Sequence, residues 1–266
     1  MYFDTHAHYD DPKFKKDLKE LFGAMRLDGV VAVVNCASDM KSCSNTLKLT
    51  KDYNFVYGAV GVHPHAVKDL DEDDVDRLYN YATQSKKIVA IGEIGLDYHY
   101  DFSPRDLQRD WFIEQIELAK ELELPIIVHS REAAKDTFDI IEGCDASEVG
   151  GIIHSYSGNL EMAREYVDMG FYLGIGGMLT FPDVKKILRV VEEIPLERLL
   201  LETDAPYLSP VPKRGQRNDS RNLKYVAERI AQLKGITAEE VEKVTTENAC
   251  RVFNIKLQTQ PNVILQ

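Results

Sequence analysis

The chain alternates short apolar runs with longer stretches in which apolar and charged residues recur at helical spacing. Most of the apolar runs are followed by a polar residue, a glycine or a proline. Continuous apolar runs of this length indicate strands that are buried on both faces, as in a parallel sheet. The eight expected strands are Tyr2–Asp4, Val30–Asn35, Phe55–Gly61, Ile88–Gly92, Ile126–Val128, Gly151–Ile153, Phe171–Ile175 and Leu199–Leu201.

The stretches between the apolar runs have the spacing of amphipathic helices. The clearest is Pro104–Leu124, where Trp111, Gln115 and Leu118 fall on one face together with Leu107, Phe112, Ala119 and Leu122. Ser103-Pro104 is a typical start, because proline is favoured at the first helical position. The other expected helices are Phe14–Asp28, Met40–Tyr53, Asp71–Gln84, Glu132–Glu142, Leu160–Met169, Asp183–Val191, Ser220–Leu233 and Ala238–Phe253.

Strand and helix thus alternate eight times in a chain of 266 residues. This order predicts an α/β fold, a single-domain (β/α)8 TIM barrel over residues 1–254. Residues 255–266 lack periodicity, and we expect them to form a short C-terminal tail on the surface. A doubly wound open sheet is the alternative. Its nucleotide-binding versions are disfavoured, because no G-x-G-x-x-G follows the first strand and no P-loop is present.

Composition narrows the classes of partner. The net charge of −12 argues against a protein that coats nucleic acid by bulk electrostatics, although an enzyme could still grip a few phosphates locally. The four cysteines form no C-x-x-C pair, which favours reduced thiols and a cytoplasmic location. The sequence shows no signal peptide and no bilayer-spanning stretch, so we expect neither a membrane partner nor an obligate protein partner.

Titratable residues stand at the ends of several of the apolar runs. Glu93 follows a buried strand between glycines, and a buried carboxylate needs a compensating charge, most simply a cation. His6 and His8 alternate along a strand, so both imidazoles can reach one ion, although they could equally be surface or core histidines. Glu202 shares its strand face with Asp204, so the chain must twist or end between them for Asp204 alone to face the site.

His129 and His154 each close an apolar run, and taken singly each is more typical of a core histidine than of a ligand. Together with His6, Glu93 and Asp204 they fall at the C-terminal ends of strands one, four, five, six and eight. In a barrel these ends converge on one mouth, where barrel enzymes have their active sites. The joint pattern therefore predicts a centre that can hold two cations.

Other residues near this mouth are candidate substrate contacts. His63 and His65 flank a proline, and we favour a role in holding a phosphate oxygen over metal ligation, with a structural turn as the alternative. Arg131 suits phosphate because its guanidinium fork matches phosphate geometry. Arg214 and Arg217 lie in a short basic loop that would overhang the mouth, or it is an ordinary solvated loop. We expect Asp97 to lie in a loop, where it could orient a ligand or cap a turn, and we favour the turn. Tyr98, His99 and Tyr100 could stack a base, but we favour simple packing.

Seven stretches along the chain resemble the TatD family of metal-dependent deoxyribonucleases, in the amidohydrolase superfamily. The similarity runs from Asp4 to about Phe253 and is specific for the family rather than for a substrate. The matching stretches are Asp4-Thr5-His6-Ala7-His8, Gly61-Val62-His63-Pro64-His65, Gly92-Glu93-Ile94-Gly95-Leu96-Asp97-Tyr98, His129-Ser130-Arg131-Glu132, His154-Ser155-Tyr156-Ser157-Gly158, Glu202-Thr203-Asp204-Ala205-Pro206-Tyr207-Leu208 and Arg214-Gly215-Gln216-Arg217-Asn218.

The resemblance implies two divalent metal ions (Mg, Mn or Zn), bridged by Glu93. One ion would be held by His6, His8, Glu93 and Asp204, and the other by Glu93, His129 and His154. It implies cleavage of phosphodiesters with a metal-activated water, as a 3′→5′ exonuclease on single-stranded DNA or DNA 3′ ends. Glu93 and Asp204 would be the catalytic residues, with Asp204 accepting or relaying the proton. The alternatives are a superfamily hydrolase of a small ester, amide or lactone, and a metal-binding barrel without turnover.

Overall fold

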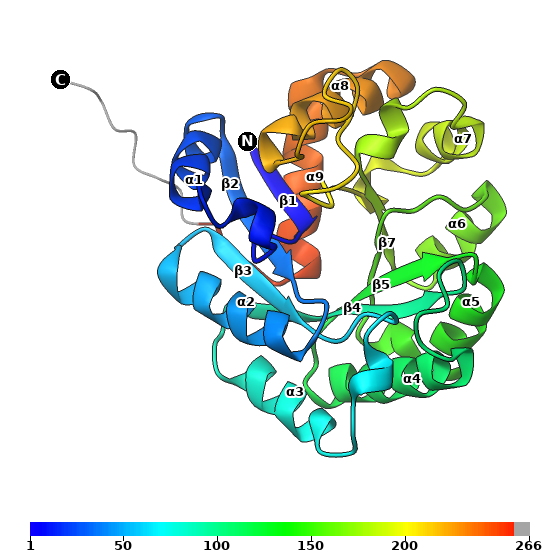
Figure 1. Cartoon of the computed structure of the whole chain (residues 1–266). Helices are drawn as coiled ribbons and strands as arrows, with labels where there is room; N and C mark the ends of the chain where they lie inside the picture. The colour runs from blue at the N-terminus through cyan, green and yellow to red at the C-terminus, as the bar shows by residue number, and fades with distance from the viewer. Residues whose placement is uncertain (258–266) are drawn as a thin grey trace.

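Eight parallel strands form one sheet in sequence order, and the sheet closes into a barrel (Figure 1). The structure is a computed structural model that describes residues 1–257. Closure between the first and last strands comes from a parallel bridge between Ala7 and Ala205. The predicted (β/α)8 TIM barrel is therefore confirmed and the open sheet is wrong. The strands are β1 (Tyr2–Ala7), β2 (Val30–Cys36), β3 (Val56–Val60), β4 (Ile88–Asp97), β5 (Ile126–Arg131), β6 (Gly151–Ile153), β7 (Tyr172–Ile175) and β8 (Leu199–Leu201).

Helices surround the barrel and alternate with the strands, as the spacing of apolar residues predicts (Figure 1). The α-helices are α1 (Leu18–Leu27), α2 (Met40–Asp52), α3 (Asp74–Thr83), α4 (Arg105–Glu121), α5 (Ala134–Gly143), α6 (Leu160–Asp168), α7 (Lys185–Glu193), α8 (Leu223–Lys234) and α9 (Ala238–Val252). Short 3-10 turns precede α1 and α8, at Pro12–Phe14 and Ser220–Asn222, where longer α-helices were expected. The buried face of α4 includes Gln108 and Ile116, whereas Leu107 is 38% exposed, contrary to the expected face.

The barrel interior is apolar below its C-terminal end. One buried cluster takes residues from all eight strands, among them Phe3, Ile127 and Leu200. Phe253 at the end of α9 and Ile255 beyond it pack into the same cluster. Ile255 is therefore buried, although we expected it on the surface as the start of the tail. Residues 258–266 of the predicted tail lie outside the described residues.

Four strands are longer than their apolar runs, β2 by the single residue Cys36 and three others by more. β1, β4 and β5 continue to Ala7, Asp97 and Arg131, so that His6, Glu93 and His129 lie within strands rather than just after them. The expected ends were wrong because the first polar residue was taken as the end of the strand. In a barrel the last inward positions of a strand face the mouth, where polar side chains are tolerated.

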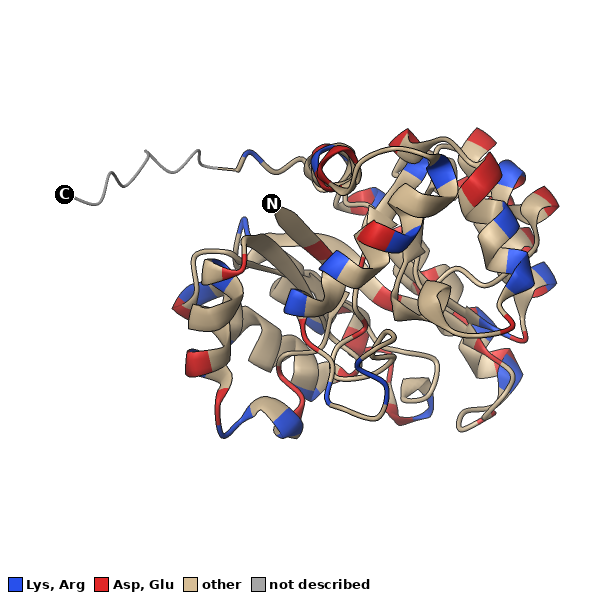
Figure 2. Cartoon of the chain, turned by 90° about the horizontal axis from the view of Figure 1, so that it is seen from above, with Lys and Arg blue, Asp and Glu red and all other residues tan. Residues whose placement is uncertain are grey.

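Charged residues are distributed over the outer helices, with both signs interspersed (Figure 2). This agrees with a net charge that is spread over the molecule rather than gathered into one basic surface. Among residues 1–257, no helix combines the length and apolar character that crossing a membrane requires.

Candidate metal centre

The two-residue period of strands brings the histidines of β5 and β6 to the barrel mouth. Ile127 and Ile152 point into the apolar interior, so His129 and His154, two residues further on, face inward one layer above it. Both side chains are largely buried, with exposed fractions of 18% and 4%. The apolar layer below them therefore forms the floor of the polar site.

The course of the chain after β8 determines which of Glu202 and Asp204 faces the site. β8 ends at Leu201, and Glu202 takes the inward position after Leu200, where it is fully buried. Asp204 has a left-handed backbone with φ of 57°, and its amide donates to the carbonyl of His6 at 2.9 Å. The chain thus turns after Glu202, as required, and holds the Asp204 carboxylate against β1.

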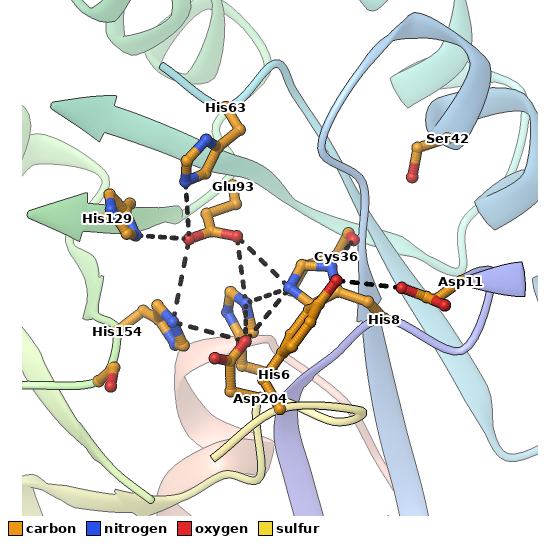
Figure 3. A network of polar contacts seen from close by, with 12 residues as sticks. His6, His8, Asp11, Cys36, Ser42, His63, Glu93, His129, His154 and Asp204 are labelled. Atoms are coloured by element: carbon orange, nitrogen blue, oxygen red, sulfur yellow. Dashed lines mark hydrogen bonds and ion pairs between the residues drawn. The ribbon is translucent and has the colours of Figure 1, made fainter. Parts of the chain in front are cut away.

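Glu93 lies at the centre of the histidines, and its two carboxylate oxygens face different groups (Figure 3). Oε1 lies 2.9 Å from Nδ1 of His129 and 3.7 Å from Nε2 of His63. Oε2 lies 3.3 Å from Nε2 of His6 and 3.5 Å from Nε2 of His8. A carboxylate with this arrangement can give one oxygen to each of two neighbouring cations.

Asp204 completes the side of the centre that β1 supplies. Its Oδ1 atom lies 3.3 Å from Nε2 of His8 and 3.8 Å from Nε2 of His6. Nε2 of His154 lies 3.9 Å from Oδ1 of Asp204 and 3.9 Å from Oε1 of Glu93. The structure thus brings together all six predicted ligands, His6, His8, Glu93, His129, His154 and Asp204 (Figure 3).

His63 has a different place from the one that the sequence suggested. Its ligand atom clusters with those of Glu93 and His129, all within 4.8 Å of one another. His6, His8 and Glu93 form an equivalent cluster on the other side. His63 is therefore a candidate ligand as well as a candidate substrate contact, and it lies nearer to Glu93 than His154 does.

Two buried carboxylates hold histidines of the centre from behind. Asp97 Oδ2 lies 3.2 Å from Nε2 of His129 and 2.9 Å from Nε2 of His65. Glu202 Oε1 lies 3.0 Å from Nδ1 of His154 and accepts the amide of Ser155 at 2.7 Å. Such carboxylate–histidine pairs fix the orientation of metal-binding imidazoles and raise their basicity.

The expected position of Asp97 in a loop was wrong. Asp97 is the last residue of β4 and is 1% exposed. Its backbone amide donates a hydrogen bond to Oε1 of Gln108 on α4 at 2.8 Å. It does cap the following turn, because Oδ1 accepts the amides of His99 and Tyr100 at 3.0 Å each. The sequence pattern assigned neither Asp97 nor Glu202 a role in holding a histidine. A usable signal was present for Glu202, because it is an acid two residues before the candidate ligand Asp204.

The pKa values of the imidazoles at the centre shift in both directions. Burial and neighbouring imidazoles lower the pKa values of His6 and His63, whereas carboxylates raise those of His8 and His154. Burial alone would lower the pKa of His154, but the charge of Glu202 and contacts with Glu93 and Asp204 raise it to about 10. Burial opposes protonation of His8 as well, but the Asp204 hydrogen bond and the Glu93 charge raise its pKa to about 9. Burial would raise the pKa of Glu93, yet the surrounding imidazoles, His6 foremost, hold it well below its usual range.

The donor set fits divalent cations. Imidazole nitrogens and carboxylate oxygens converge in three groups among the described residues. Two of the groups share Glu93, and the third joins His6, His154 and Glu202. Such mixed ligands suit Zn²⁺, Mn²⁺ and Mg²⁺, and the set alone does not choose between them.

A cavity of about 1180 Å³ opens above the centre. His63, His65 and Arg131 line it, as predicted for substrate contacts, together with Lys41 and Lys68. As the structure describes them, Arg214 and Arg217 do not line this cavity. Arg214 lies over the ring of Phe181 at 3.9 Å, and Arg217 pairs with Asp17 at 2.6 Å. Their role as substrate contacts stays a prediction.

Relatives among known proteins match nearly the whole chain. The family model described as "TatD related DNase" matches residues 3–254. The "uncharacterized metal-dependent hydrolase YabD" of Bacillus subtilis is 45% identical over 255 residues, which cover 96% of this chain and 100% of that one. The corresponding hydrolase YcfH of Escherichia coli is 34% identical over 255 residues, 95% of each chain.

A solved structure shows the same architecture. The crystal structure of YjjV, a TatD homologue from Escherichia coli K12, superposes with a TM-score of 0.90 at 30% identity, over 96% of this chain and 98% of that one. The barrel, the ligand set at its mouth and these similarities lead to one conclusion: this chain belongs to the TatD family and is a metal-dependent hydrolase.

Proposed function

We propose that this protein is a deoxyribonuclease that hydrolyses phosphodiesters of single-stranded DNA from the 3′ end, with two divalent cations (Mg²⁺, Mn²⁺ or Zn²⁺). The observation that carries the proposal is the position of Glu93, whose oxygens face His129 on one side and His6 and His8 on the other. A shared carboxylate is the arrangement that two-metal phosphodiester hydrolysis requires. The family description, TatD related DNase, supports DNA as the substrate.

The protein residues have separable roles in this proposal. His6, His8, Glu93 and Asp204 would hold one cation, and Glu93, His129 and His154 the other, with His63 as a further candidate. When bound, such cations neutralise charge on the phosphoryl oxygens and lower the pKa of a water molecule. The Asp204 carboxylate lines the cavity and would accept the proton of the attacking water and pass it to solvent.

Asp204 is suited to this role by its charge state. Burial would raise its pKa, but the hydrogen bond from His8 and the charge of His154 hold it below the usual value of aspartate. The carboxylate is therefore ionised at neutral pH and ready to accept a proton. Its exposed side-chain fraction of 17% leaves a path for that proton to solvent.

The charges around the cavity explain why an anionic substrate would depend on metal. Seven carboxylates line it: Asp10, Asp11, Asp39, Asp69, Glu93, Asp97 and Asp204. Only Lys41, Lys68 and Arg131 offer fixed positive charge there. A phosphodiester would be repelled by this surplus of carboxylates unless cations offset it. Arg131 and His65 would then contact the phosphate, Arg131 through its planar fork.

The test is digestion of a 5′-labelled single-stranded DNA oligonucleotide with Mg²⁺, Mn²⁺, Zn²⁺ or EDTA. The wild-type protein should give a ladder that shortens from the 3′ end with metal and remain inactive in EDTA. Glu93→Gln should lower the rate by roughly 10³-fold, because metal-bound catalysis supplies several kcal/mol of transition-state stabilisation. Glu117→Gln, which changes an exposed glutamate on α4, is the matched control and should retain wild-type activity.

Each other outcome has a definite meaning. Intact DNA in every lane, from protein that carries metal, would exclude this substrate, and a panel of small esters, amides and lactones would then be assayed. Cutting from the 5′ end or internal cutting would keep the nuclease and overturn the polarity. Cutting that survives Glu93→Gln would show that Glu93 does not hold the metal.

A further inference from the structure

Two large aromatic side chains stand exposed at the edge of the cavity. Tyr100 and Phe102 lie in the loop between β4 and α4 (Figure 1), with exposed fractions of 48% and 54%. Both line the same cavity as the metal centre. Their rings stack on each other, with centroids 5.1 Å apart and planes inclined by 18°. We expected Tyr100 to pack, and it does pack on Phe102, but the pair is exposed beside a polar cavity, a place where aromatic rings often serve in binding.

The aromatic pair is connected to the catalytic centre by direct contacts. The ring of His65 meets the edges of Phe102 at 4.8 Å and Tyr100 at 5.4 Å between centroids. His65 lies 2.9 Å from Asp97, which in turn holds His129. The pair therefore borders the site on the β4–β5 side, with His65 and Asp97 between it and the candidate ligand His129.

Arg131 adds a positive charge to this surface. Its guanidinium lies 4.8 Å from the centroid of the Tyr100 ring and faces the cavity. Among residues 1–257, the structure gives Arg131 no carboxylate partner. Arg131 and Phe102 thus both lie against the Tyr100 ring, and Phe102 is the more exposed ring of the pair. An exposed ring with a guanidinium nearby matches a nucleotide, which has a flat base and an adjacent phosphate.

The loop that carries the pair is fixed by the protein. Asp97 accepts the amide of Tyr100, and Ser103 donates to the carbonyl of His65 at 3.1 Å. Arg105 pairs with Asp101 at 2.7 Å and lies 4.3 Å from the Tyr98 ring centroid. A surface that is ordered before binding loses less conformational entropy when the ligand arrives.

We propose that Tyr100 and Phe102 form a stacking subsite for an unpaired nucleobase of the DNA strand, next to the phosphate that is cleaved. This inference rests on the proposed function and makes it specific. The terminal base of a duplex is held in line by pairing with the opposite strand, whereas a terminal unpaired base is free to turn and stack on the protein. The subsite thus gives the enzyme a physical basis for preferring single-stranded ends. It tolerates every base, because each has a π face.

The first test measures cleavage of two 5′-labelled oligonucleotides, one intact and one with an abasic residue at the 3′ terminus, in Mn²⁺. The double variant Tyr100→Leu/Phe102→Leu keeps apolar volume against His65 but removes the π faces. The wild type should cleave the intact strand about tenfold faster than the abasic strand, and the double variant should cleave both at the slower rate. Tyr79→Leu, an exposed tyrosine on α3, is the matched control and should keep the tenfold preference.

The second test does not depend on turnover. A strand with 2-aminopurine as its 3′ base and phosphorothioate linkages beside it is titrated with protein in Mn²⁺, and stacking quenches the fluorescence of the base. The wild type and Tyr79→Leu should quench it, and the double variant should not. Equal quenching by the double variant, or binding without quenching by the wild type, would overturn the subsite.

The two readouts separate the two proposals. Metal-dependent cleavage without base preference would leave the nuclease standing and overturn the subsite. Quenching that requires Tyr100 and Phe102 without any cleavage would support the subsite and overturn the nuclease. Neither cleavage nor quenching would overturn both.

Discussion

Two buried carboxylates, Asp4 and Glu93, occupy neighbouring parts of the barrel and have opposite surroundings. Asp4 is 0% exposed and Glu93 is 3% exposed, so neither has water to solvate its charge. Asp4 accepts hydrogen bonds from the hydroxyls of Thr203 and Ser220 at 2.6 Å each, and from the amide of Thr203 at 3.0 Å. Glu93 is instead surrounded by imidazoles, whose nitrogens can turn toward an ion.

The difference shows how a structural carboxylate is told from a metal-binding one. The donors around Asp4 are hydroxyls and amides, which hold the segment before Asp204 in place. Burial raises the pKa of Asp4 to about 7, because it outweighs these hydrogen bonds, which lower the pKa. The neighbours of Glu93 are groups that bind cations, and several of them are also ion-paired with Asp204. Asp4 and Glu93 are both buried, so the chemical identity of their neighbours decides which of them can bind a metal ion.

The largest expected effect that tests this comparison is the stabilisation by metal. At a metal concentration about 1,000 times Kd, binding should raise the free energy of unfolding by about 4 kcal/mol. This corresponds to a rise in Tm of about 10 °C for a domain of this size. Thermal unfolding with chelator and with Mn²⁺ measures the effect. Glu93→Gln should lose most of it and Glu117→Gln should keep it; an undiminished shift in Glu93→Gln would refute the metal-binding role.

The next effect concerns Glu202, a third buried carboxylate that holds His154. Glu202→Gln should weaken metal binding by roughly 10–100-fold, the usual effect of losing such a supporting group. The metal-free protein should also lose some stability at neutral pH, because the charge of Glu202 is the main group that raises the pKa of His154, and Oε1 accepts the amide of Ser155. Metal titration followed by calorimetry measures the affinity. Unchanged affinity together with lower stability of the metal-free protein would make Glu202 purely structural.

Asp4→Asn should lower stability without weakening metal binding. The amide cannot accept all the bonds that the carboxylate accepts, which should lower the free energy of unfolding by roughly 1–2 kcal/mol. The cost is limited because the hydroxyls of Thr203 and Ser220 can rotate to accept from the new amide. Denaturant unfolding of metal-free protein measures it, and metal titration should give the wild-type affinity. A large loss of metal affinity at full stability would remove the distinction between Asp4 and Glu93.

The smallest expected effect concerns Lys87, a partly buried cation whose hydrogen-bond partners are backbone carbonyls of the protein. Lys87 donates to the carbonyls of Thr50 and Tyr53 at 2.5 and 2.6 Å, and partial burial lowers its pKa to about 8. Between this pH and the ordinary lysine pKa of about 10.4, the unfolded chain binds more protons than the folded one. Stability contributed by this site should therefore rise with pH across that window.

Denaturant unfolding of the wild type and Lys87→Met at pH values from 7.5 to 10.5 measures this contribution. The difference between the two should change by a few tenths of a kcal/mol, because the half-exposed ammonium is screened by solvent. Lys86→Met, at the exposed neighbouring lysine, serves as the control. A difference that stays constant across this range would show that burial does not perturb Lys87.

Much of the fold could be predicted because local pattern and tertiary position agree in a barrel. The expected strands Gly151–Ile153 and Leu199–Leu201 are found with the same bounds, since each apolar run ends where pairing ends. β4 was predicted to end at Gly92 and continues to Asp97. Its last residues pair with β5, from Ile94 opposite Val128 to Asp97 opposite Arg131. The glycines and Glu93 interrupt the apolar run there, which hides the continuation of the strand.

The residues that gather at the barrel mouth were predicted, whereas their supporting contacts were predicted less well. His6 and His8 were found because alternation along a strand is a local property, and Glu93 because it follows an apolar run between two glycines. The supporting contacts join residues that are far apart in the sequence. Asp97 contacts His129, 32 positions away, and Glu202 contacts His154, 48 positions away. His63 contacts Glu93, 30 positions away. No local pattern reports such distances, so their partners could only be seen in three dimensions.

The sequence by itself determined the barrel, its strand order and the residue types at its mouth, because periodicity and the placement of polar residues after apolar runs are written along the chain. Tertiary structure decided which carboxylate serves which role. Asp4, Glu93, Asp97 and Glu202 are all buried acids in strands or just after one. Hydroxyls and amides contact Asp4, whereas at least one imidazole contacts each of the others. The energy of a buried charge depends on the atoms within a few ångströms of it, and closure of the barrel sets those neighbours.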